Sequence, residues 1–344
     1  SDRVGGRIAT DEVDGFLLDR GFQVFLTAYE ECQQVLDYHT LQLKMFEPGA
    51  LCYHGGKLHR LSDPWRRPQH IWSTAFSGAA TLADKLRIAR LRAQVARGST
   101  TDIYTHPEQT TRERLAEAGF SPVIMQRFFR PFLRGIFLEP ELSTSSRMFE
   151  FVFRMFGSGQ AALPAGGMQA IPKQVADGLP AESIRLQSRV AAIEGQTVTL
   201  DSGETLSAPR VVLATENANA SKLAPLPERS ACGVTCVYFA ADKAPIDEAI
   251  LVLNGESEGP INNLCFPNLV SWTYATNDKT LVSATVLGDN HGAALVEEVQ
   301  NQLIRWFGPE AEKYQHLRTY SIPFALPSQS TLEPVEKDPA IRPG

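Results

Sequence analysis

Near its amino terminus the chain carries two adjacent glycines between two arginines, in the stretch Arg3-Val4-Gly5-Gly6-Arg7-Ile8-Ala9-Thr10. Glycines let the backbone approach a bulky group closely and turn its amides toward an anion. The flanking arginines can bind phosphate oxygens through paired hydrogen bonds. Taken alone, such a turn is more often a plain loop, so the segments that follow must decide between the two interpretations.

The segments around this turn predict short strands and a second glycine turn. Glycines punctuate two β-rich runs, residues 15–19 and 21–25. The second turn, Leu163-Pro164-Ala165-Gly166-Gly167-Met168, leads into a predicted helix over 171–178. Three β signals follow at 184–186, 190–193 and 197–200, and the apolar run 210–215 is typical of a buried strand.

Residues from about 31 to 155 are predicted to be mostly helical. One helix is expected from the Thr81 cap to about Arg97, with Asp84 completing a capping box and Gly98 ending the helix. Its apolar stripe is expected to be Leu82, Leu86, Ala89, Ala93 and Ala96. Further helices are predicted over 112–118, from Pro122 until Pro131 interrupts, and around 149–156.

The remainder of the chain predicts a sheet followed by a helix. Strands are expected at 233–240, 250–253, 269–274 and 280–287. Leu295, Val299 and Leu303 predict one face of a helix that ends at Gly308.

Composition excludes several functional classes. The net charge of −6 gives no electrostatic support to nucleic-acid binding. No apolar run reaches the roughly 18 residues of a membrane span, and the first residues do not resemble a secretory signal. Five scattered cysteines favour a reducing compartment, so we expect a cytoplasmic protein. No hydrolase or metal-site motif is present, because the histidines lack ligand spacing and Cys232 and Cys236 lie about 13 Å apart on a strand.

Two apolar features leave alternatives open. The arginine-rich helix 82–97, near Trp65-Arg66-Arg67, could lie on a membrane surface, but its alanine-rich stripe favours a solvated face. Eight phenylalanines could line a hydrophobic tunnel or form a plain helical core, and we weight the core slightly higher. They are Phe128, Phe129, Phe132, Phe137, Phe149, Phe151, Phe153 and Phe156.

Six of these segments, in this order, resemble the superfamily of flavin-dependent amine oxidases, protoporphyrinogen oxidases and carotenoid (phytoene) desaturases. Residues 3–10 are similar to the GG-doublet of that superfamily, and 19–25 resemble the stretch that passes the flavin ring. The helical segment 128–146, the turn at 163–168, Val190 and the strand 211–216 complete the resemblance. It covers most of the chain.

The resemblance implies FAD as cofactor and assigns roles to eleven residues. Arg3, Gly5, Gly6 and Arg7 would face the phosphates. Val190 and Glu216 would lie on the adenine side. Gly21, Phe22, Gln23, Gly167 and Met168 would lie on the flavin side. No catalytic acid or base can be named.

The chain also departs from the superfamily pattern. It contains neither the Gly-x-Gly-x-x-Gly turn that precedes the doublet in relatives nor their later Gly-Asp segment. Each charge-assisted bond to the pyrophosphate contributes about 1.5–3 kcal/mol, so losing two or three removes on the order of 5 kcal/mol. We therefore expect a chain truncated at both ends that binds FAD weakly or not at all and associates through unpaired sheet edges.

The predicted fold class is α/β plus α+β. An incomplete, Rossmann-like FAD-binding domain (1–40, 157–225 and 320–344) would carry an inserted helical and mixed-sheet substrate domain (41–156 and 226–319). The predicted function is an FAD-dependent oxidoreductase that moves a hydride from an apolar or amine substrate to flavin N5. The alternative is a non-catalytic fragment that binds a hydrophobic ligand or a partner protein.

Overall fold

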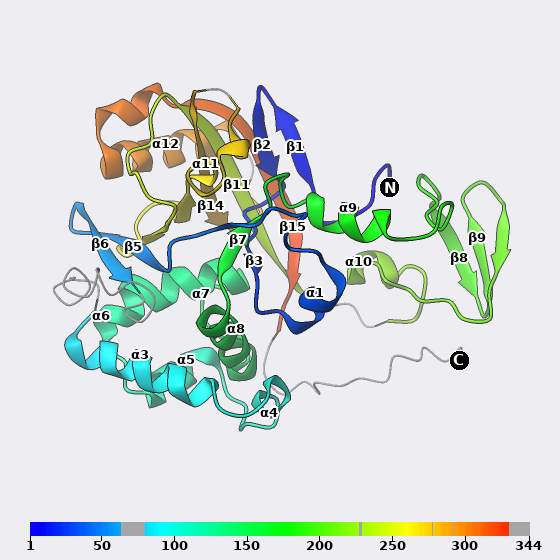
Figure 1. The fold of residues 1–344 in the computed structure, drawn as a ribbon, viewed down its shortest axis with the longest axis horizontal. Helices are drawn as coiled ribbons and strands as arrows, with labels where there is room; N and C mark the ends of the chain where they lie inside the picture. Colours follow the sequence, from blue (N-terminus) through cyan, green and yellow to red (C-terminus); the bar gives the residue numbers. More distant parts are fainter. Residues whose placement is uncertain (63–79, 227–228, 277, 291, 330–344) are drawn as a thin grey trace.

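The computed structural model describes residues 1–62, 80–226, 229–276, 278–290 and 292–329 (Figure 1). The largest sheet in these residues has seven strands in the order β15-β11-β14-β13-β12-β5-β6. Neighbouring strands are antiparallel except for the parallel pair β12–β5. The strands are β5 (Gly49–His54), β6 (Lys57–Ser62), β11 (Ala231–Ala241), β12 (Leu251–Asn254), β13 (Ile261–Cys265), β14 (Thr280–Leu287) and β15 (Gln315–Pro327).

The long strand β11 contributes alternate side chains to two cores, because successive residues of a strand point to opposite faces. Val237 and Phe239 pack beneath α12 (Ala293–Phe307), with the short helix η4 (Pro309–Lys313) beside it. On the other face, Cys236 and Tyr238 pack against apolar residues of the amino-terminal segment. The large sheet is therefore covered by a helix on one face and by the start of the chain on the other.

The described residues form three further, smaller sheets. One is the hairpin of β1 (Thr10–Val13) and β2 (Phe16–Asp19). Another has the order β3-β7-β4, from β3 (Phe25–Leu26), β4 (Lys44–Met45) and β7 (Ala161–Leu163). The third comprises β8 (Val190–Glu194), β9 (Thr197–Leu200) and β10 (Thr205–Ser207). Short helices accompany them: α1 (Glu30–Val35), α9 (Ala170–Asp177), α10 (Asn217–Ala220), α11 (Pro267–Val270) and η3 (Trp272–Tyr274).

A layer of helices lies beside the β5–β6 end of the large sheet (Figure 1). It contains α3 (Leu82–Val95), α4 (Thr100–Ile103), α5 (Thr111–Glu117), α6 (Pro122–Ile124), η2 (Met125–Phe129), α7 (Arg130–Phe137) and α8 (Ser146–Ser158). Phe129, Phe149 and Leu133 are fully buried in its centre. Phe128 and Phe132 reach the sheet at Cys52. The phenylalanines thus pack as a helical core, the more heavily weighted of the two interpretations.

Helix α3 confirms its predicted cap but not its predicted apolar stripe. Thr81 and Asp84 form the expected capping box. The buried side chains, however, are Asp84, Leu91 and Val95, whereas Leu82 and Leu86 are 68% and 73% exposed. The stripe was wrong because the buried face is fixed by contact with α8 and by the partners of Asp84, which helical spacing alone does not reveal.

Pro131 does not interrupt its helix, contrary to the prediction. It occupies the first turn of α7, where a missing N–H costs little. The preceding π-turn η2 accommodates the proline ring by widening the helix over one turn. A continuous helical path therefore runs from Pro122 to Phe137.

Several predicted strands are absent from the described structure. Residues 184–186 and 210–215 are irregular, and Val212 is 85% exposed, because no described strand pairs with either segment. Residues 269–274 form the end of α11 and η3, which follow the helix-starting Pro267. Only Phe25 of the run 21–25 enters a strand.

The hairpin β5–β6 was missed within a region predicted to be mostly helical. Its two-residue turn is Gly55-Gly56, and both glycines have positive φ. Such a glycine pair between apolar runs is a hairpin signal. The other predicted helices and strands agree with α5, α8, α9, α12, β2, β8, β9, β11, β12 and β14 to within a few residues.

The mixed α/β architecture with a large mixed sheet agrees with the predicted fold class. Its Rossmann-like part stays a prediction, and so do the domain boundaries; the boundary at 319/320 lies inside β15. Within the described residues no helix is both long and apolar enough to cross a bilayer. Residues 65–67, which were part of the alternative that this region lies on a membrane surface, are outside the described part of the chain.

Candidate functional site

The glycine pair lies in a turn that Arg3 and Gln169 hold from the inside. The guanidinium of Arg3 donates to the backbone oxygens of Val4 and Ile8 at 3.1 Å, to that of Gly6 at 3.0 Å and to Gln169 Oε1 at 3.2 Å. Gln169 in turn donates to the Val4 oxygen at 3.0 Å. Arg3 therefore supports the turn instead of pointing to solvent as an anion ligand.

The two glycines differ in their surroundings. Both have positive φ, 103° at Gly5 and 54° at Gly6. A Cβ on Gly5 would lie 2.6 Å from the Ile8 oxygen and 2.7 Å from Pro172 Cγ, whereas one on Gly6 would meet no atom within 4 Å. Gly5 packs inward and Gly6 faces open space.

The outer side of this turn has unused hydrogen-bond donors. Within the described residues, the backbone amides of Gly6 and Arg7 donate to no other group. The Arg7 side chain is exposed and donates to the backbone oxygen of Ala325 at the end of β15. Adjacent backbone amides without an internal acceptor at a positive-φ turn are the kind of donors that anions bind in other proteins.

A buried carboxylate connects β1 to the second glycine turn. Asp19 Oδ1 accepts from Thr10 Oγ1 at 2.6 Å and from the Met168 amide at 2.9 Å, while Oδ2 accepts from Tyr274 Oη at 2.8 Å. The Asp19 backbone oxygen accepts from Tyr238 Oη at 2.8 Å. Four segments that are far apart in sequence therefore meet at this one residue.

The flavin-side candidates Gly167 and Met168 lie at this junction. Gly167 has φ 77°, and a Cβ there would lie 2.6 Å from Thr10 Oγ1. Met168 is buried in the core beside the sheet. The two glycine turns are neighbours, since the Gln169 side chain donates to the Val4 oxygen and the Gln169 amide donates to Thr10 Oγ1, each at 3.0 Å.

The other flavin-side candidates border the same core. Gly21 has φ 87°, and a Cβ there would lie 2.9 Å from Ile322 Cδ1 of β15. Phe22 is half-buried with its ring edge-on to Phe46 at 6.5 Å, and Gln23 is half-buried beside it. These positions show packing against β15 and the core.

The adenine-side candidates lie further along the chain. Val190 starts β8 and pairs with Leu200, and the backbone of Gln187, three residues earlier, donates to the Ser1 oxygen at 2.6 Å. This bond keeps the β8 sheet next to the amino terminus. Glu216 is exposed at the start of α10 and accepts from Asn219 at 2.7 Å; none of the described contacts joins it to the glycine pair.

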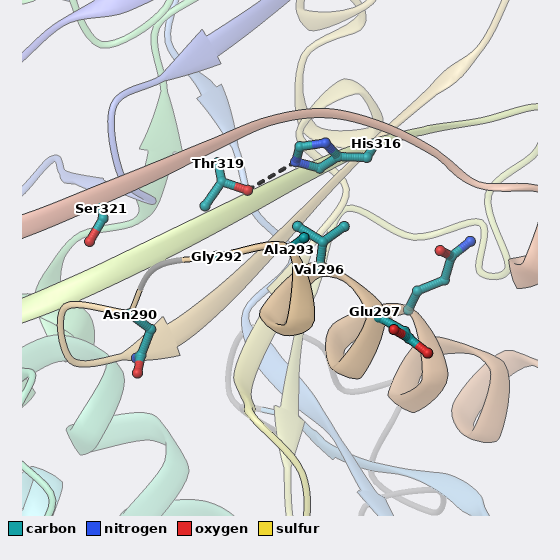
Figure 2. A pocket seen from close by; sticks show the side chains of 9 residues that line it. Asn290, Gly292, Ala293, Val296, Glu297, His316, Thr319 and Ser321 are labelled. Carbon is teal, nitrogen blue, oxygen red and sulfur yellow. Dashed lines mark hydrogen bonds between the residues drawn. The ribbon is translucent and has the colours of Figure 1, made fainter.

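The hollows described in this structure lie elsewhere. One of about 560 Å³ lies between the start of α12 and β15, where polar side chains such as Asn290, Glu297 and His316 line it (Figure 2). Another of about 440 Å³ lies between α3 and α8, next to Glu150 and Arg114. Neither is lined by the phenylalanine core.

Redox-active thiols are not a feature of the junction. All five cysteines are free, and burial raises the pKa of Cys236 to about 11 and that of Cys52 to about 12. Buried thiols of this kind stay protonated and are chemically inert. No metal cluster occurs among the residues that the structure describes.

Five residues of this junction were not among the predicted site residues: Asp19, Thr10, Gln169, Tyr238 and Tyr274. Asp19 stood within a quoted motif, and a single acidic residue in an apolar strand was a usable signal. The other four carry no local signal, because their role depends on the meeting of distant segments.

Comparison with known proteins agrees with this architecture. The family model described as flavin containing amine oxidoreductase matches residues 1–339. A solved structure from Exiguobacterium sp. 255-15, with the provisional name protoporphyrinogen oxidase, is similar with a TM-score of 0.68 at 17% identity over 95% of this chain and 80% of that one. The structure of a putrescine oxidase variant gives a TM-score of 0.65 at 18% identity, over 93% of this chain and 77% of that one.

Cyclohexylamine oxidase from Brevibacterium oxydans IH-35A gives a TM-score of 0.64 at 16% identity over 93% of this chain and 77% of its own. At these identities the structures show a shared fold. Comparison with curated protein sequences finds no match. Because the family model matches nearly the whole sequence, the chain belongs to the flavin-containing amine oxidoreductases.

Proposed function

We propose that this chain has the fold and cofactor site of an FAD-dependent oxidoreductase that removes a hydride from an apolar or amine substrate. The observation that carries the proposal is the turn at Gly5 and Gly6: within the described residues the Gly6 and Arg7 amides have no acceptor, and a Cβ on Gly6 would meet no atom within 4 Å. Bound flavin would supply the two-electron acceptor at N5, and the protein would supply binding and orientation.

The phosphate side of the cofactor is assigned to the Gly6 and Arg7 amides. Arg7 can add its guanidinium, because that group is exposed and held by a single carbonyl. Arg3 acts indirectly by holding the turn. Val190 and Glu216 remain the proposed adenine side.

The flavin side is assigned to Gly21, Phe22, Gln23, Gly167 and Met168. The packing of Gly167 against Thr10 fixes where this turn lies, next to the first glycine turn. We name no catalytic acid or base. The family suggests amines as the first substrates to test, and the names of two similar structures, putrescine oxidase and cyclohexylamine oxidase, point to the same class.

A titration of the 344-residue polypeptide with FAD tests the proposal. We expect a dissociation constant weaker than about 1 μM, because the sequence contains no Gly-x-Gly-x-x-Gly turn to add further phosphate bonds. Micromolar or tighter binding would contradict the weak-affinity part of the proposal. No binding up to about 1 mM, which corresponds to about −4 kcal/mol, would contradict the assigned cofactor site.

Gly6→Asp gives a sharper test, with Gly195→Asp as its control. Both glycines have φ between 54° and 59°, and neither would place a Cβ within 4 Å of another atom. The two variants therefore add the same charge at the same backbone conformation. Only Gly6→Asp should weaken FAD binding, by about tenfold or more, because its carboxylate would repel a phosphate. Equal effects of the two variants would refute the assignment.

The alternative function, a non-catalytic fragment that binds a partner, is favoured by one observation. Large apolar side chains are exposed along one part of the chain: Val175, Leu179, Ile184, Leu186, Leu206 and Val212. Exposed apolar groups mark interaction surfaces when they form a patch. A purified protein without flavin colour that nevertheless binds a partner through these residues would support this alternative.

A further inference from the structure

Asp19 is the meeting point of three hydrogen-bond donors from separate parts of the chain. Thr10 belongs to β1, the Met168 amide belongs to the second glycine turn, and Tyr274 ends η3. All three donate to the carboxylate, at 2.6 to 2.9 Å. A carboxylate is the side chain that can accept from all of them at once.

The surroundings of this carboxylate are apolar and contain no basic partner among the described contacts. Asp19 is 4% exposed within the core that includes Phe16, Leu18 and Met168. The titratable groups that face it are Tyr274 and Tyr238, with the thiols of Cys236 and Cys265 further away. The neighbouring Arg20 points the other way and pairs with Asp11 at 2.9 Å.

We propose that Asp19 is a positioning residue, whose buried carboxylate holds the Gly167–Met168 turn in place against β1 and η3. Since the function proposed above places this turn on the flavin side, Asp19 would position the flavin without touching the reacting atoms. The connection to flavin rests on that proposed function, whereas the hold on the turn does not.

The Gly167–Met168 turn has little room to move, so the residue that fixes its position is important. A Cβ on Gly167 would lie 2.5 Å from Thr10 Cγ2, so the backbone is already in close contact with β1. The Thr10 hydroxyl donates to Asp19 and accepts from the Gln169 amide at 3.0 Å. Loss of the carboxylate would leave the Met168 amide and the two hydroxyls without their acceptor.

The carboxylate also gives this junction a pH dependence. Burial raises the pKa of Asp19 above 3.8, although the three donors oppose the change. A raised pKa in the folded state means that the folded protein holds its proton more tightly than the unfolded chain. Stability from this group is therefore complete below pH 3.8 and is lost as the pH rises through the raised pKa.

Asp19→Asn and Asp19→Ala separate the charge from the hydrogen bonds. The asparagine oxygen can accept from Thr10 and Met168, and its amide can donate to the Tyr274 oxygen, so the geometry is kept without the charge. We expect Asp19→Asn to retain slow hydrogen exchange at the Met168 amide. We expect Asp19→Ala to raise that exchange rate about tenfold or more, the equivalent of one lost buried hydrogen bond.

Asp11→Asn is the matched control, because Asp11 lies in the same hairpin. The Arg20 hydrogen bond lowers the pKa of Asp11, although partial burial opposes this, so the stability that Asp11 contributes changes with pH in the opposite direction to that of Asp19. The melting temperatures of wild type and of Asp11→Asn, each measured relative to the same background carrying Asp19→Asn, should therefore fall as the pH rises above 3.8. A melting-temperature difference that does not fall, or unchanged Met168 exchange in Asp19→Ala, would overturn the proposal.

Tyr274→Phe keeps the proposal testable where Asp19→Ala fails to fold. It removes one donor from the carboxylate and keeps the ring, so the pH-dependent loss of stability should move to higher pH. The absence of any such movement would count against the proposal.

A final titration with FAD separates the two claims. Asp19→Ala should weaken FAD binding about tenfold relative to Asp11→Asn if the turn faces the flavin. If wild type binds no FAD, the proposed function fails, while the exchange and pH results still decide the role of Asp19. If FAD binds wild type and Asp19→Ala equally, the positioning of the flavin by Asp19 is refuted.

Discussion

Gly5 and Gly6 show that neighbouring residues of one type can be required for different reasons. At Gly5 a side chain would collide with the Ile8 oxygen and Pro172, and the φ of 103° is strained for any L-residue. At Gly6 the φ of 54° is the left-handed region, with open space around it. Gly5 is needed for the fold of the turn and Gly6 for access to its outer side.

We predict that Gly5→Ala destabilises the protein more than Gly6→Ala. Gly5→Ala should lower the free energy of unfolding by about 2–3 kcal/mol through backbone strain and close contact. Gly6→Ala should lower it by about 1 kcal/mol, the cost of the left-handed conformation. Chemical denaturation of both variants measures the difference, and the reverse order would contradict the geometry described for the turn.

At the scale of elements, Asp84 joins the starts of two helices. It caps α3 through Thr81 and accepts from the Ser121 amide at 2.9 Å and the Ser121 hydroxyl at 2.6 Å at the start of α6. Burial by itself raises the pKa of Asp84, but the hydrogen bonds from Ser121 and Thr81 outweigh it and lower the pKa below 3.8. The residue is fully buried, so these helices share one acceptor that water does not replace.

We predict that Asp84→Asn destabilises the protein by about 3 kcal/mol at neutral pH, since it places an amide against several donors. A lowered folded pKa means that this stability is present above pH 3.8 and is lost as the pH falls through the folded value. The difference in the free energy of unfolding between wild type and Asp84→Asn, measured by urea denaturation, should therefore become smaller in acid. Asp102→Asn, the equivalent change in the exposed capping box of α4, should have a smaller effect.

Helix α7 approaches the sheet closely at Gly135. A Cβ there would lie 2.8 Å from Asn263 Oδ1 and 3.1 Å from Asn262 Nδ2, both buried on β13. Asn262 also donates to the backbone oxygen of Pro131 at 2.9 Å, which fixes the start of the same helix. The contact of this helix with the sheet depends on the missing side chain.

We predict that Gly135→Ala lowers the melting temperature, although alanine favours helices by about 1 kcal/mol. Overpacking against Asn263 should cost about 1–3 kcal/mol and exceed that gain. Gly157→Ala in α8 is the control, because its Cβ would meet Arg92 at an ordinary 3.8 Å. Gly157→Ala should leave the melting temperature unchanged or raise it. A higher melting temperature in both variants would contradict the close contact between Gly135 and β13.

At the scale of the whole molecule, packing is uneven. β11 is buried on both faces, between α12 and the amino-terminal segment. The part of the chain between residues 175 and 212 exposes large apolar side chains instead, and the run 210–215 forms no strand with the described residues. The energetic centre of the fold is therefore the seven-stranded sheet.

We predict that the polypeptide self-associates in a concentration-dependent manner through the exposed apolar residues. Replacing Val212 and Leu186 by lysine should reduce the association, since it removes apolar surface and adds like charges. Sedimentation velocity over a range of concentrations measures this. A wild-type protein that stays monomeric at high concentration would refute the prediction.

Features that depend only on neighbouring residues could be predicted from the amino-acid sequence. The Thr81–Asp84 cap, the end of α12 at Gly308 and the strand β14 follow from capping chemistry, a glycine stop and a run of apolar residues. The glycine pair was recognised for the same reason, because positive φ is a local demand. The superfamily was evident from these motifs in their order along the chain.

Contacts between segments that are distant in sequence could not be predicted in this way, because they depend on how the complete chain packs. The buried face of α3, the parallel pairing of β5 with β12 and the junction at Asp19 each join segments that are distant in sequence. Run 210–215 shows the converse, because an apolar run forms a strand only where another strand offers hydrogen bonds. Local propensity limits which secondary structures a segment can adopt, and the hydrogen-bond and packing partners in the rest of the fold determine which of these structures forms.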